Sequence, residues 1–333
     1  METIMKGRGI SVVIPNYNGV ALLPQVLPPA LVALKRTGLP FEIIVVDDAS
    51  TDESVRSLRL HFPDVQLHIN TVNSGFSVTA NTGIRLATYP HVLLLNSDVK
   101  LEPEYFDVLM NFCDRKDVLG VMGRIIGWDD EAIQDGAKYP LFQGGKIKTS
   151  ANYILEDEQQ MKKGLYTMYL SGANAFFNKE LFLKIGGFNE LFSPFYAEDT
   201  ELSLRAWRLG YQCLYAHQAV CRHRASTTIK SSNRKKYIQI IYNRNKMFLH
   251  AIHLEGWTRM VWFLQLLIEI VFQTLLLRFS YLTSFRLLLR NYHLVRQNRS
   301  ALRQLSGAKK LRSVSGVFQF IKDSLKDQVV IRF

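Results

Sequence analysis

The stretch EIIVVDDAS, residues 42–50, places four consecutive apolar side chains, at 43–46, directly before two adjacent carboxylates, Asp47 and Asp48. An uninterrupted apolar run of this length is typical of a strand that is covered on both faces of a parallel sheet. Helix N-capping explains one acidic or hydroxyl residue at such a position, but it does not require two carboxylates. The stretch therefore predicts a buried parallel strand that ends in a polar site.

The chain around this stretch alternates between apolar runs and helical patterns. Apolar runs cover 10–15, 41–46, 65–69 and 91–95, and helical patterns cover 20–35, 53–61, 77–87, 102–113, 179–185 and 200–209. Such an alternation predicts an α/β fold with a mostly parallel sheet, flanking helices and right-handed crossovers. The Gly-rich stretch 123–167 is expected to add loops and short strands beside the sheet.

Polar residues follow the apolar runs at the points where the strands are expected to end. They lie at 15–18, 47–50, 70–73 and 96–98. Ligands of open parallel sheets bind beyond these carboxyl ends. A carboxylate such as Asp98 can hold Mg²⁺ or Mn²⁺ together with substrate phosphates, although an Asx turn also explains an Asn or Asp at a strand end. The sequence has no GxGxxG after the first run and no GxxxxGK[ST], which argues against a dinucleotide site of that type and a P-loop.

Three acids in four residues, Glu198, Asp199 and Glu201, open the helix expected at 200–209. Acidic residues in a first turn complement the helix dipole, but one of them is enough for that purpose. A carboxylate in a partly apolar cleft can act as a general base. His223 follows another strand-like stretch as a lone histidine, for which a structural role is the more common one.

The basic charge is concentrated in the last third of the chain. Residues 1–221 carry 20 Lys and Arg against 25 Asp and Glu, whereas residues 222–333 carry 21 against 4. Helical patterns at 235–253, 257–277 and 285–305 interleave this charge with Leu, Phe and Trp, which favours an anionic membrane surface over nucleic acid. The apolar helix at 257–277 has the length to span a bilayer, but its polar stripe also fits a helix that lies on the membrane or dips into it. A buried helical subdomain is the alternative.

Cysteine usage indicates a reducing compartment. The chain has 3 cysteines and no CxxC spacing, so neither a disulfide framework nor a zinc knuckle is expected. The apolar run after the polar residues 1–9 is shorter than the core of a secretory signal, and no signal peptide is expected.

Six ordered blocks of the sequence resemble glycosyltransferase family 2. The blocks are SVVIPNYNG (11–19), EIIVVDDASTDES (42–54), NSGFSVTANTGI (73–84), LLLNSDV (93–99), GGFNELFSPFYAEDTELSLRAWRLGY (186–211) and VCRH (220–223). YNRNKMFL, at 242–249, is similar to the segment that follows the catalytic domain in that family. The resemblance implies an inverting, metal-dependent enzyme of the GT-A fold. Among the subgroups, it is closest to bacterial rhamnosyltransferase-type enzymes of surface-polysaccharide assembly.

The resemblance also implies roles for individual residues. The residues implied to bind the nucleotide are Pro15, Asn16 and Asp48, with Asp47 beside them and Asn73 and Asn81 lining the same pocket. Asn96 stands where many members have the first acid of the metal motif, so a divalent metal, Mg²⁺ or Mn²⁺, is expected to bind Asp98 and the donor diphosphate. His223 matches a position that often completes the metal site, and Asp199 matches the catalytic base.

These inferences give an expected organisation. Residues 1–233 form a GT-A catalytic domain, with a nucleotide-sugar half at about 1–122 and an acceptor half at about 123–233. Residues 234–333 form a basic, amphipathic, helical, membrane-associated region. The expected reaction moves a sugar from a UDP- or dTDP-sugar to a hydroxyl of a glycan or lipid-linked acceptor at the cytoplasmic face of the cell membrane, in cell-surface polysaccharide synthesis.

Three alternative functions differ in the features they require. A sugar-1-phosphate nucleotidyltransferase needs a Gly- and Arg-rich loop after the first strand, which residues 16–23 lack. A nucleic-acid-binding protein is motivated by the basic last third alone. A catalytically inactive scaffold is motivated only by Asn96, and Asp98 and Asp199 are both present.

Overall fold

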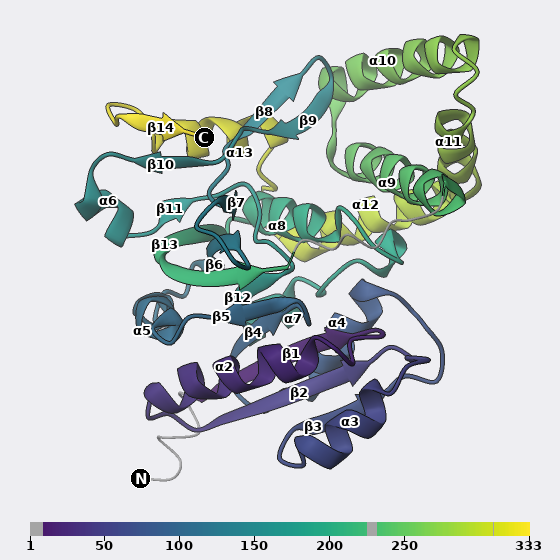
Figure 1. The fold of residues 1–333 in the computed structure, drawn as a ribbon. Coiled ribbons are helices and arrows are strands. Elements are labelled where there is room, and N and C mark those ends of the chain that lie inside the picture. Colours follow the sequence, from purple (N-terminus) through teal and green to yellow (C-terminus); the bar gives the residue numbers. More distant parts are fainter. Residues whose placement is uncertain (1–8, 225–231, 309) are drawn as a thin grey trace.

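The computed structural model describes residues 9–224, 232–308 and 310–333 (Figure 1). Within these residues the central sheet has ten strands. Their order is β11 (Leu165–Tyr166), β13 (Gln212–His223), β6 (Val118–Gly127), β12 (Asn174–Asn178), β4 (His91–Leu95), β1 (Ile10–Asn16), β2 (Phe41–Asp47) and β3 (Gln66–Ile69), with β5 (Val99–Leu101) beside β13 and β7 (Ile133–Asp135) beside β6. Residues 1–8, which were expected to contain no secretory signal, lie outside the described ranges.

The N-terminal half of the sheet is parallel, as the alternating pattern predicts. Its elements are β1 (Ile10–Asn16), α2 (Leu23–Arg36), β2 (Phe41–Asp47), α3 (Ser54–His61), β3 (Gln66–Ile69), α4 (Phe76–Leu86) and β4 (His91–Leu95). Successive side chains of a strand point to opposite faces. Val12 and Ile14 therefore join the buried cluster that includes α2, whereas Val13 joins the cluster that includes α4. Gly83 lets α4 approach β1 closely, because a Cβ there would lie 2.3 Å from a methyl carbon of Val13.

The second half of the sheet is mixed. Its elements are β5 (Val99–Leu101), α5 (Tyr105–Leu109), the 3-10 turn η1 (Met110–Phe112), β6 (Val118–Gly127), β12 (Asn174–Asn178), α7 (Lys179–Lys184), the 3-10 turn η2 (Glu190–Phe192), α8 (Glu198–Leu209) and β13 (Gln212–His223). β12 lies antiparallel between β4 and β6, and β13 runs parallel to β6. The helix predicted over 102–113 is shorter than expected, since the chain tightens into η1 at Met110.

The Gly-rich middle of the chain forms short strands, as expected, and two of them, β7 and β11, belong to the central sheet. They are β7 (Ile133–Asp135), β8 (Pro140–Gln143), β9 (Lys146–Thr149), β10 (Tyr153–Leu155) and β11 (Leu165–Tyr166), with the short helix α6 (Glu158–Lys162) between the last two. β8 and β9 form an antiparallel hairpin that reaches toward the C-terminal helices (Figure 1).

The C-terminal third is helical. Its elements are α9 (Ser232–His253), α10 (Gly256–Leu275), α11 (Ser280–Arg290), α12 (Tyr292–Ser306) and α13 (Val314–Asp323), followed by β14 (Val330–Arg332). The pattern at 285–305 predicts one helix, but the chain forms two, α11 and α12, which meet at Asn291. The Asn291 side chain donates to the carbonyl of Leu287 in the last turn of α11. α10 lies at the outer edge of the molecule (Figure 1) and has the length and apolar composition to cross a membrane.

These helices share a buried core with the sheet. One cluster contains Trp207 of α8, Phe248 of α9 and Phe318 of α13. β14 pairs antiparallel with β10, which brings the end of the described chain back to its middle. Arg299 of α12 donates to the carbonyls of Ala251 and of its neighbours at the end of α9, so part of the basic charge caps a helix.

Candidate active site

Buried polar side chains join the ends of β1 and β2. Asn16 Nδ2 donates to Asp47 Oδ2 at 2.8 Å, and the Ser50 hydroxyl donates to the same oxygen at 2.6 Å. Asp47 is fully buried, and its other oxygen accepts the Ser50 N–H at 2.9 Å. Asp47 therefore shapes the loop after β2. Asn16 Oδ1 is buried without a hydrogen-bond partner in the described part of the chain, and Pro15 precedes it in β1.

Asp48 organises the loop between β3 and α4. Its Oδ1 accepts from Asn70 Nδ2 at 2.8 Å and from the Ser74 N–H at 3.0 Å, and its Oδ2 accepts from the Gly75 N–H at 2.8 Å. Three hydrogen bonds to one carboxylate fix this loop in place. Asn73 lies exposed in the same loop, beside the groups that Asp48 holds.

The loop that Asp48 holds touches the turn before α8. Gly75 has a φ of 86°, and a Cβ there would lie 2.6 Å from Pro194 Cα, so only glycine fits. The Phe76 N–H donates to the Pro194 carbonyl at 2.9 Å. The loop before α4 and the turn that leads into the acid cluster, which are far apart in the sequence, are thus in direct contact.

Asn81 lies elsewhere, on the buried side of α4. Its Nδ2 donates to the Phe188 carbonyl at 2.9 Å and to Glu190 Oε1 at 3.0 Å, and its Oδ1 accepts from the Phe188 N–H at 2.8 Å. None of these hydrogen bonds joins Asn81 to Asn16 or Asp48. Its hydrogen bonds hold the segment that leads to the acid cluster.

Asp98 and His223 face each other where β5 pairs with β13. Asp98 Oδ2 lies 3.5 Å from His223 Nε2, and Asp98 Oδ1 is buried without a hydrogen-bond partner among the residues described. His223 Nδ1 lies 2.8 Å from Gln134 Oε1, and the hydrogen bond to Asp98 raises the pKa of His223, although partial burial opposes that shift. The half-buried Asn96 side chain precedes this pair in the same turn.

This pair fits a divalent cation that takes its remaining ligands from elsewhere. Within residues 9–224, 232–308 and 310–333, no group of three or more His, Cys, Asp and Glu side chains could hold a metal by itself. Mg²⁺ and similar ions are commonly bound by one or two carboxylates, water and substrate phosphates. The unpartnered Asp98 oxygen and the His223 nitrogen supply donors of that kind.

The three acids at the start of α8 have different environments. Glu201 is buried against Arg205, with N···O 2.6 Å, and His253, with N···O 3.2 Å. Although burial alone would raise the pKa of Glu201, the charge and hydrogen bonds of these partners lower it to about 2. Glu201 therefore has a structural role. Glu198 and Asp199 line a cavity instead.

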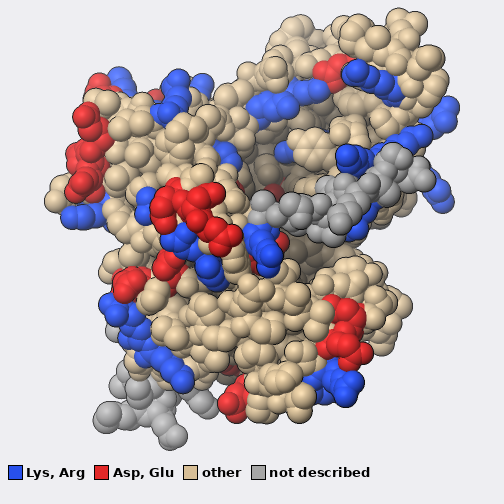
Figure 2. Space-filling model, in the orientation of Figure 1, with Lys and Arg blue, Asp and Glu red and all other residues tan. Residues whose placement is uncertain are grey.

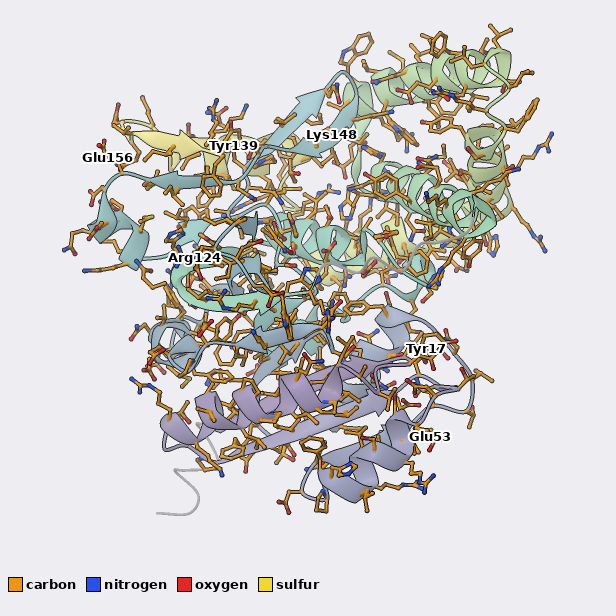
Figure 3. All side chains as sticks on the ribbon, in the orientation of Figure 1. Tyr17, Glu53, Arg124, Tyr139, Lys148 and Glu156 are labelled. Carbon is orange, nitrogen blue, oxygen red and sulfur yellow. The ribbon has the colours of Figure 1, made fainter. Side chains whose placement is uncertain are left out.

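The cavity has a volume of about 350 Å³, and α9 and β9 form part of its wall. Its lining residues are Ile147, Lys148, Thr149, Tyr169, Tyr196, Ala197, Glu198, Asp199, Thr200, Tyr242, Lys246 and Leu249. Figure 3 labels Lys148 on the β8–β9 hairpin and Tyr17 just beyond the end of β1. Tyrosine rings and charged groups around one cavity are suited to a carbohydrate, which offers both apolar faces and hydroxyl groups.

Burial sets the proton affinity of the two cavity acids. It raises the pKa of Asp199, an effect that the hydrogen bonds from Thr200 and the charge of Lys246 oppose. Burial and the neighbouring Asp199 charge raise the pKa of Glu198 to about 8, and Glu198 Oε2 has no hydrogen-bond partner in the described ranges. A carboxylate with a raised pKa, next to an open cavity, is suited to accept a proton.

The site includes residues that the sequence analysis did not single out. Asp135 Oδ2 accepts from the Tyr169 hydroxyl at 2.9 Å, and its Oδ1 accepts from Lys138 Nζ at 2.5 Å. Lys246 lies on α9, and burial lowers its pKa while the charges of Asp199 and Glu198 oppose that shift. Asp135 lies in a stretch without periodicity and had no local signal. Lys246 lies in the block 242–249, whose resemblance to family 2 marks that segment of the chain but gives Lys246 no role.

The central sheet with its flanking helices is a fold of the GT-A type. GalNAc-T7, solved with UDP, GalNAc and Mn²⁺, matches 74% of this chain and 48% of its own, with a TM-score of 0.59 at 15% identity. The mannosyltransferase PcManGT from Pyrobaculum calidifontis, in complex with GDP-Man and Mn²⁺, matches 95% of this chain and 79% of its own, with a TM-score of 0.51 at 16% identity. These similarities show the fold.

Residues 11–186 match the model of the family described as Glycosyl transferase family 2, and the chain belongs to that family. The undecaprenyl-phosphate 4-deoxy-4-formamido-L-arabinose transferase of Pectobacterium atrosepticum is 33% identical over 34% of this chain and 37% of its own length. The validoxylamine A glucosyltransferase of Streptomyces hygroscopicus subsp. jinggangensis is 28% identical over 59% and 50%. The O-antigen chain rhamnosyltransferase RfbN of Salmonella typhimurium is 25% identical over 64% and 66%. The chain thus spans about half or less of the first two relatives.

Proposed function

We propose that this protein transfers a sugar from a nucleotide-diphosphate sugar to an acceptor hydroxyl with inversion at the anomeric carbon, and that Asp199 is the general base. The observation that carries the proposal is the position of Asp199 in the first turn of α8, where it lines a cavity together with Tyr169 and Lys246 and where burial raises its pKa. Membership of family 2 favours this reaction over sugar-1-phosphate nucleotidyl transfer and over nucleic-acid binding.

The reaction balances with one catalytic carboxylate. The acceptor oxygen forms a bond to the anomeric carbon while its proton passes to Asp199. The bond between that carbon and the donor phosphate oxygen breaks, and its electron pair leaves with the nucleoside diphosphate. The transition state is oxocarbenium-like. A single displacement without a carboxylate nucleophile on the opposite face inverts the anomeric configuration.

The donor lies, in this proposal, across the ends of β1 to β4. Pro15, Asn16 and Asp48 contact the nucleoside of a UDP- or dTDP-sugar. Asp47 and Asn73 lie beside them, and Asn96 lies near the phosphates. Asn81 is assigned no contact with the nucleotide, because its amide group is bonded to Phe188 and Glu190. The unpartnered Asn16 oxygen supports a ligand at this position. Asp98 and His223 would hold a divalent cation, Mg²⁺ or Mn²⁺. When bound, such an ion supplies neutralisation of charge on the leaving diphosphate.

The acceptor enters from the other side, in the cavity of Tyr169, Tyr196 and Tyr242. We propose a glycan or lipid-linked acceptor for cell-surface polysaccharide synthesis. The relative from Pectobacterium carries undecaprenyl phosphate in its name, and RfbN is named for the O-antigen chain. Both names support an acceptor at a membrane surface.

Residues 234–333 would attach the enzyme to the cytoplasmic face of the membrane, while 1–233 form the catalytic domain. Large apolar side chains are exposed along α10, among them Trp257, Leu264, Ile268, Val271 and Leu275. An apolar helix face bounded by basic residues binds anionic lipid surfaces. The basic residues of α9, α11 and α12 supply that charge.

Thermal unfolding with a panel of nucleoside diphosphates tests the donor assignment. A ligand that binds only the folded state raises Tm by mass action. UDP or dTDP with Mn²⁺ should raise Tm, and without Mn²⁺ the shift should shrink. Absence of a shift with every nucleotide in the panel would contradict the proposal.

A further inference from the structure

A second, larger cavity lies beside the catalytic one. It has a volume of about 690 Å³ and opens between α9, α10, α11 and the β8–β9 hairpin. Its lining residues are Lys146, Lys236, Gln239, Asn243, Glu269, Gln273, Leu277, Arg278, Phe279, Ser280 and Tyr281. Figure 2 shows a hollow below α10 with Lys and Arg side chains around it.

The charge of this cavity is net positive. Lys146 Nζ pairs with Glu269 Oε2 at 2.5 Å, and the Tyr281 hydroxyl donates to the same carboxylate at 2.6 Å. Lys236 and Arg278 also line the cavity, and in the described part of the chain no carboxylate forms an ion pair with either. Two cations without a carboxylate partner in one cavity favour an anionic ligand, and Arg in particular suits phosphate geometry.

The rim of the same cavity is apolar and exposed. Leu277 is 76% exposed and Phe279 is 50% exposed, on either side of Arg278 in the turn between α10 and α11. Leu277 also has a φ of 58°, a backbone conformation that a leucine rarely adopts. Exposed apolar side chains around a cationic hollow match a ligand with an anionic head and an apolar tail.

The polar stripe of α10 faces the protein, which leaves the opposite face of the helix apolar. Gln265 Oε1 accepts the Gly145 N–H of the hairpin at 2.8 Å, and Gln265 Nε2 donates to Glu269 at 3.1 Å. The outward face carries Met260, Leu264, Ile268, Val271 and Leu275. An apolar tail that leaves the cavity past Leu277 therefore meets the exposed Leu275 at the end of α10.

The two cavities are adjacent along α9 and β9. Lys146 lines the larger one and Lys148, two residues further on the same face of β9, lines the catalytic one. On α9, Asn243 lines the larger cavity, whereas Tyr242 and Lys246 line the catalytic one. A ligand head in the larger cavity lies next to the space in front of Asp199.

We propose that the larger cavity binds the phosphate or diphosphate head of an amphiphilic acceptor. Its apolar tail lies against the α10–α11 turn, and the sugar hydroxyl carried on its head reaches Asp199. This inference rests on the proposed transfer reaction and names the class of its acceptor, a glycosylated lipid phosphate or diphosphate.

Direct binding of farnesyl diphosphate to the full chain tests the inference, with inorganic pyrophosphate and phosphatidylglycerol vesicles as separate probes. We expect farnesyl diphosphate to bind at least tenfold more tightly than pyrophosphate. The double variant Lys236→Ala/Arg278→Ala should weaken its binding about tenfold or more. The matched control Lys235→Ala/Arg290→Ala removes two exposed charges outside the cavity and should change the affinity less than twofold.

A second variant isolates the tail. Leu277→Asn removes the apolar side chain and introduces a residue that tolerates positive φ, so the backbone of the turn is preserved. This variant should lower the affinity for farnesyl diphosphate several-fold and leave the affinity for pyrophosphate unchanged. Two outcomes would show nonspecific charge attraction and overturn the inference. One is an equal loss of farnesyl diphosphate affinity in the double variant and in its control. The other is binding to phosphatidylglycerol vesicles that both variants lower alike, with no specific binding of farnesyl diphosphate.

Nucleotide binding separates this inference from the proposed function. If UDP or dTDP binds the wild type and farnesyl diphosphate does not, the acceptor site is wrong and the transfer reaction stands. If no nucleotide binds either, the transfer reaction itself is contradicted. The double variant should bind nucleotide as the wild type does, because Lys236 and Arg278 lie outside the donor site.

Discussion

Asn245 of α9 holds the turn that carries the acid cluster, since its Nδ2 lies 2.8 Å from the carbonyl oxygen of Tyr196. The same nitrogen lies within hydrogen-bond distance of the carbonyls of Phe192 and Phe195. Tyr196 and Ala197 have φ values of 76° and 69°, which are costly for residues other than glycine. A helix of the C-terminal region thus fixes the backbone from which Glu198 and Asp199 project.

Replacing Asn245 should therefore damage both stability and catalysis. Asn245→Ala leaves buried carbonyls without a donor, at a cost of about 1–3 kcal/mol. We expect a lower Tm and slower transfer, with nucleotide binding at the strand ends nearly unchanged. Differential scanning fluorimetry and a donor-binding titration measure these effects. The exposed Asn111→Ala serves as control, and an unchanged Tm in Asn245→Ala would show that the turn stands without it.

Glu198 should lower stability as the pH rises. Its pKa is about 8 in the folded protein and about 4.3 in an unfolded chain, so the unfolded state loses its proton first. Stability then falls between pH 4.3 and pH 8 and levels off above that. Glu198→Gln removes the titration, so the Tm advantage of the variant should grow from pH 5 to pH 8. The exposed Glu156→Gln should show no such trend, and a constant difference across this range would contradict the assignment.

His250 should make the protein sensitive to mild acid. It accepts the Ile147 N–H of β9 at 2.9 Å and stacks on Trp262 of α10, and burial lowers its pKa to about 3, with the charges of Lys246 and Lys146 acting in the same direction. An unfolded histidine titrates near 6.5. Below about pH 6.5 the His250 imidazole is protonated in the unfolded chain but stays neutral in the folded protein. The free energy of unfolding therefore decreases as the pH falls toward 3.

His250→Gln tests this linkage. Between pH 7 and pH 5 the wild type should lose about 2 kcal/mol more unfolding free energy than the variant, because one group contributes about 1.4 kcal/mol per pH unit below its unfolded pKa. Urea unfolding at both pH values measures the difference. Parallel losses in the two proteins would assign the acid sensitivity to other groups, such as the buried His253.

We expect Asp98 to make the affinity for the nucleotide depend on the divalent metal. Asp98→Ala removes the oxygen that has no partner in the described residues, and we expect it to weaken Mn²⁺-dependent binding of UDP or dTDP about tenfold. Binding of the nucleoside alone should change little, since Asn16 and Asp48 remain. Isothermal titration with and without Mn²⁺ checks both statements, with the exposed Asp64→Ala as control. Mn²⁺-independent nucleotide binding in the wild type would contradict the metal assignment.

The N-terminal half of the fold could be predicted because its signals are local. Uninterrupted apolar runs predicted β1, β2 and β4, and Gly210 correctly ended α8. Sequence position also showed which polar residues follow these strands. It could not show which of them contact one another, because the contact between Gly75 and Pro194 joins segments more than one hundred residues apart.

The C-terminal region shows where local signals fail. Gln265 and Glu269 were recognised as a polar stripe, but the periodicity of a helix does not show whether such a stripe meets water, lipid or a hairpin. Asn245 and Lys246 contribute to the site only because α9 packs beside α8. The pairing of β14 with β10 had no sequence signal, since two three-residue strands are too short for a visible pattern.

The decisive measurement is the rate of nucleoside diphosphate release by Asp199→Asn. The donors are sugars that carry the nucleotide identified by the panel, and a membrane extract supplies the acceptor. General bases contribute about 10²–10⁴-fold, so the rate should fall by that factor. Donor affinity should stay within about twofold of the wild type, because the strand ends that bind the nucleotide are untouched. Turnover of Asp199→Asn near the wild-type rate, with normal donor binding, would contradict the central claim that Asp199 takes the acceptor proton.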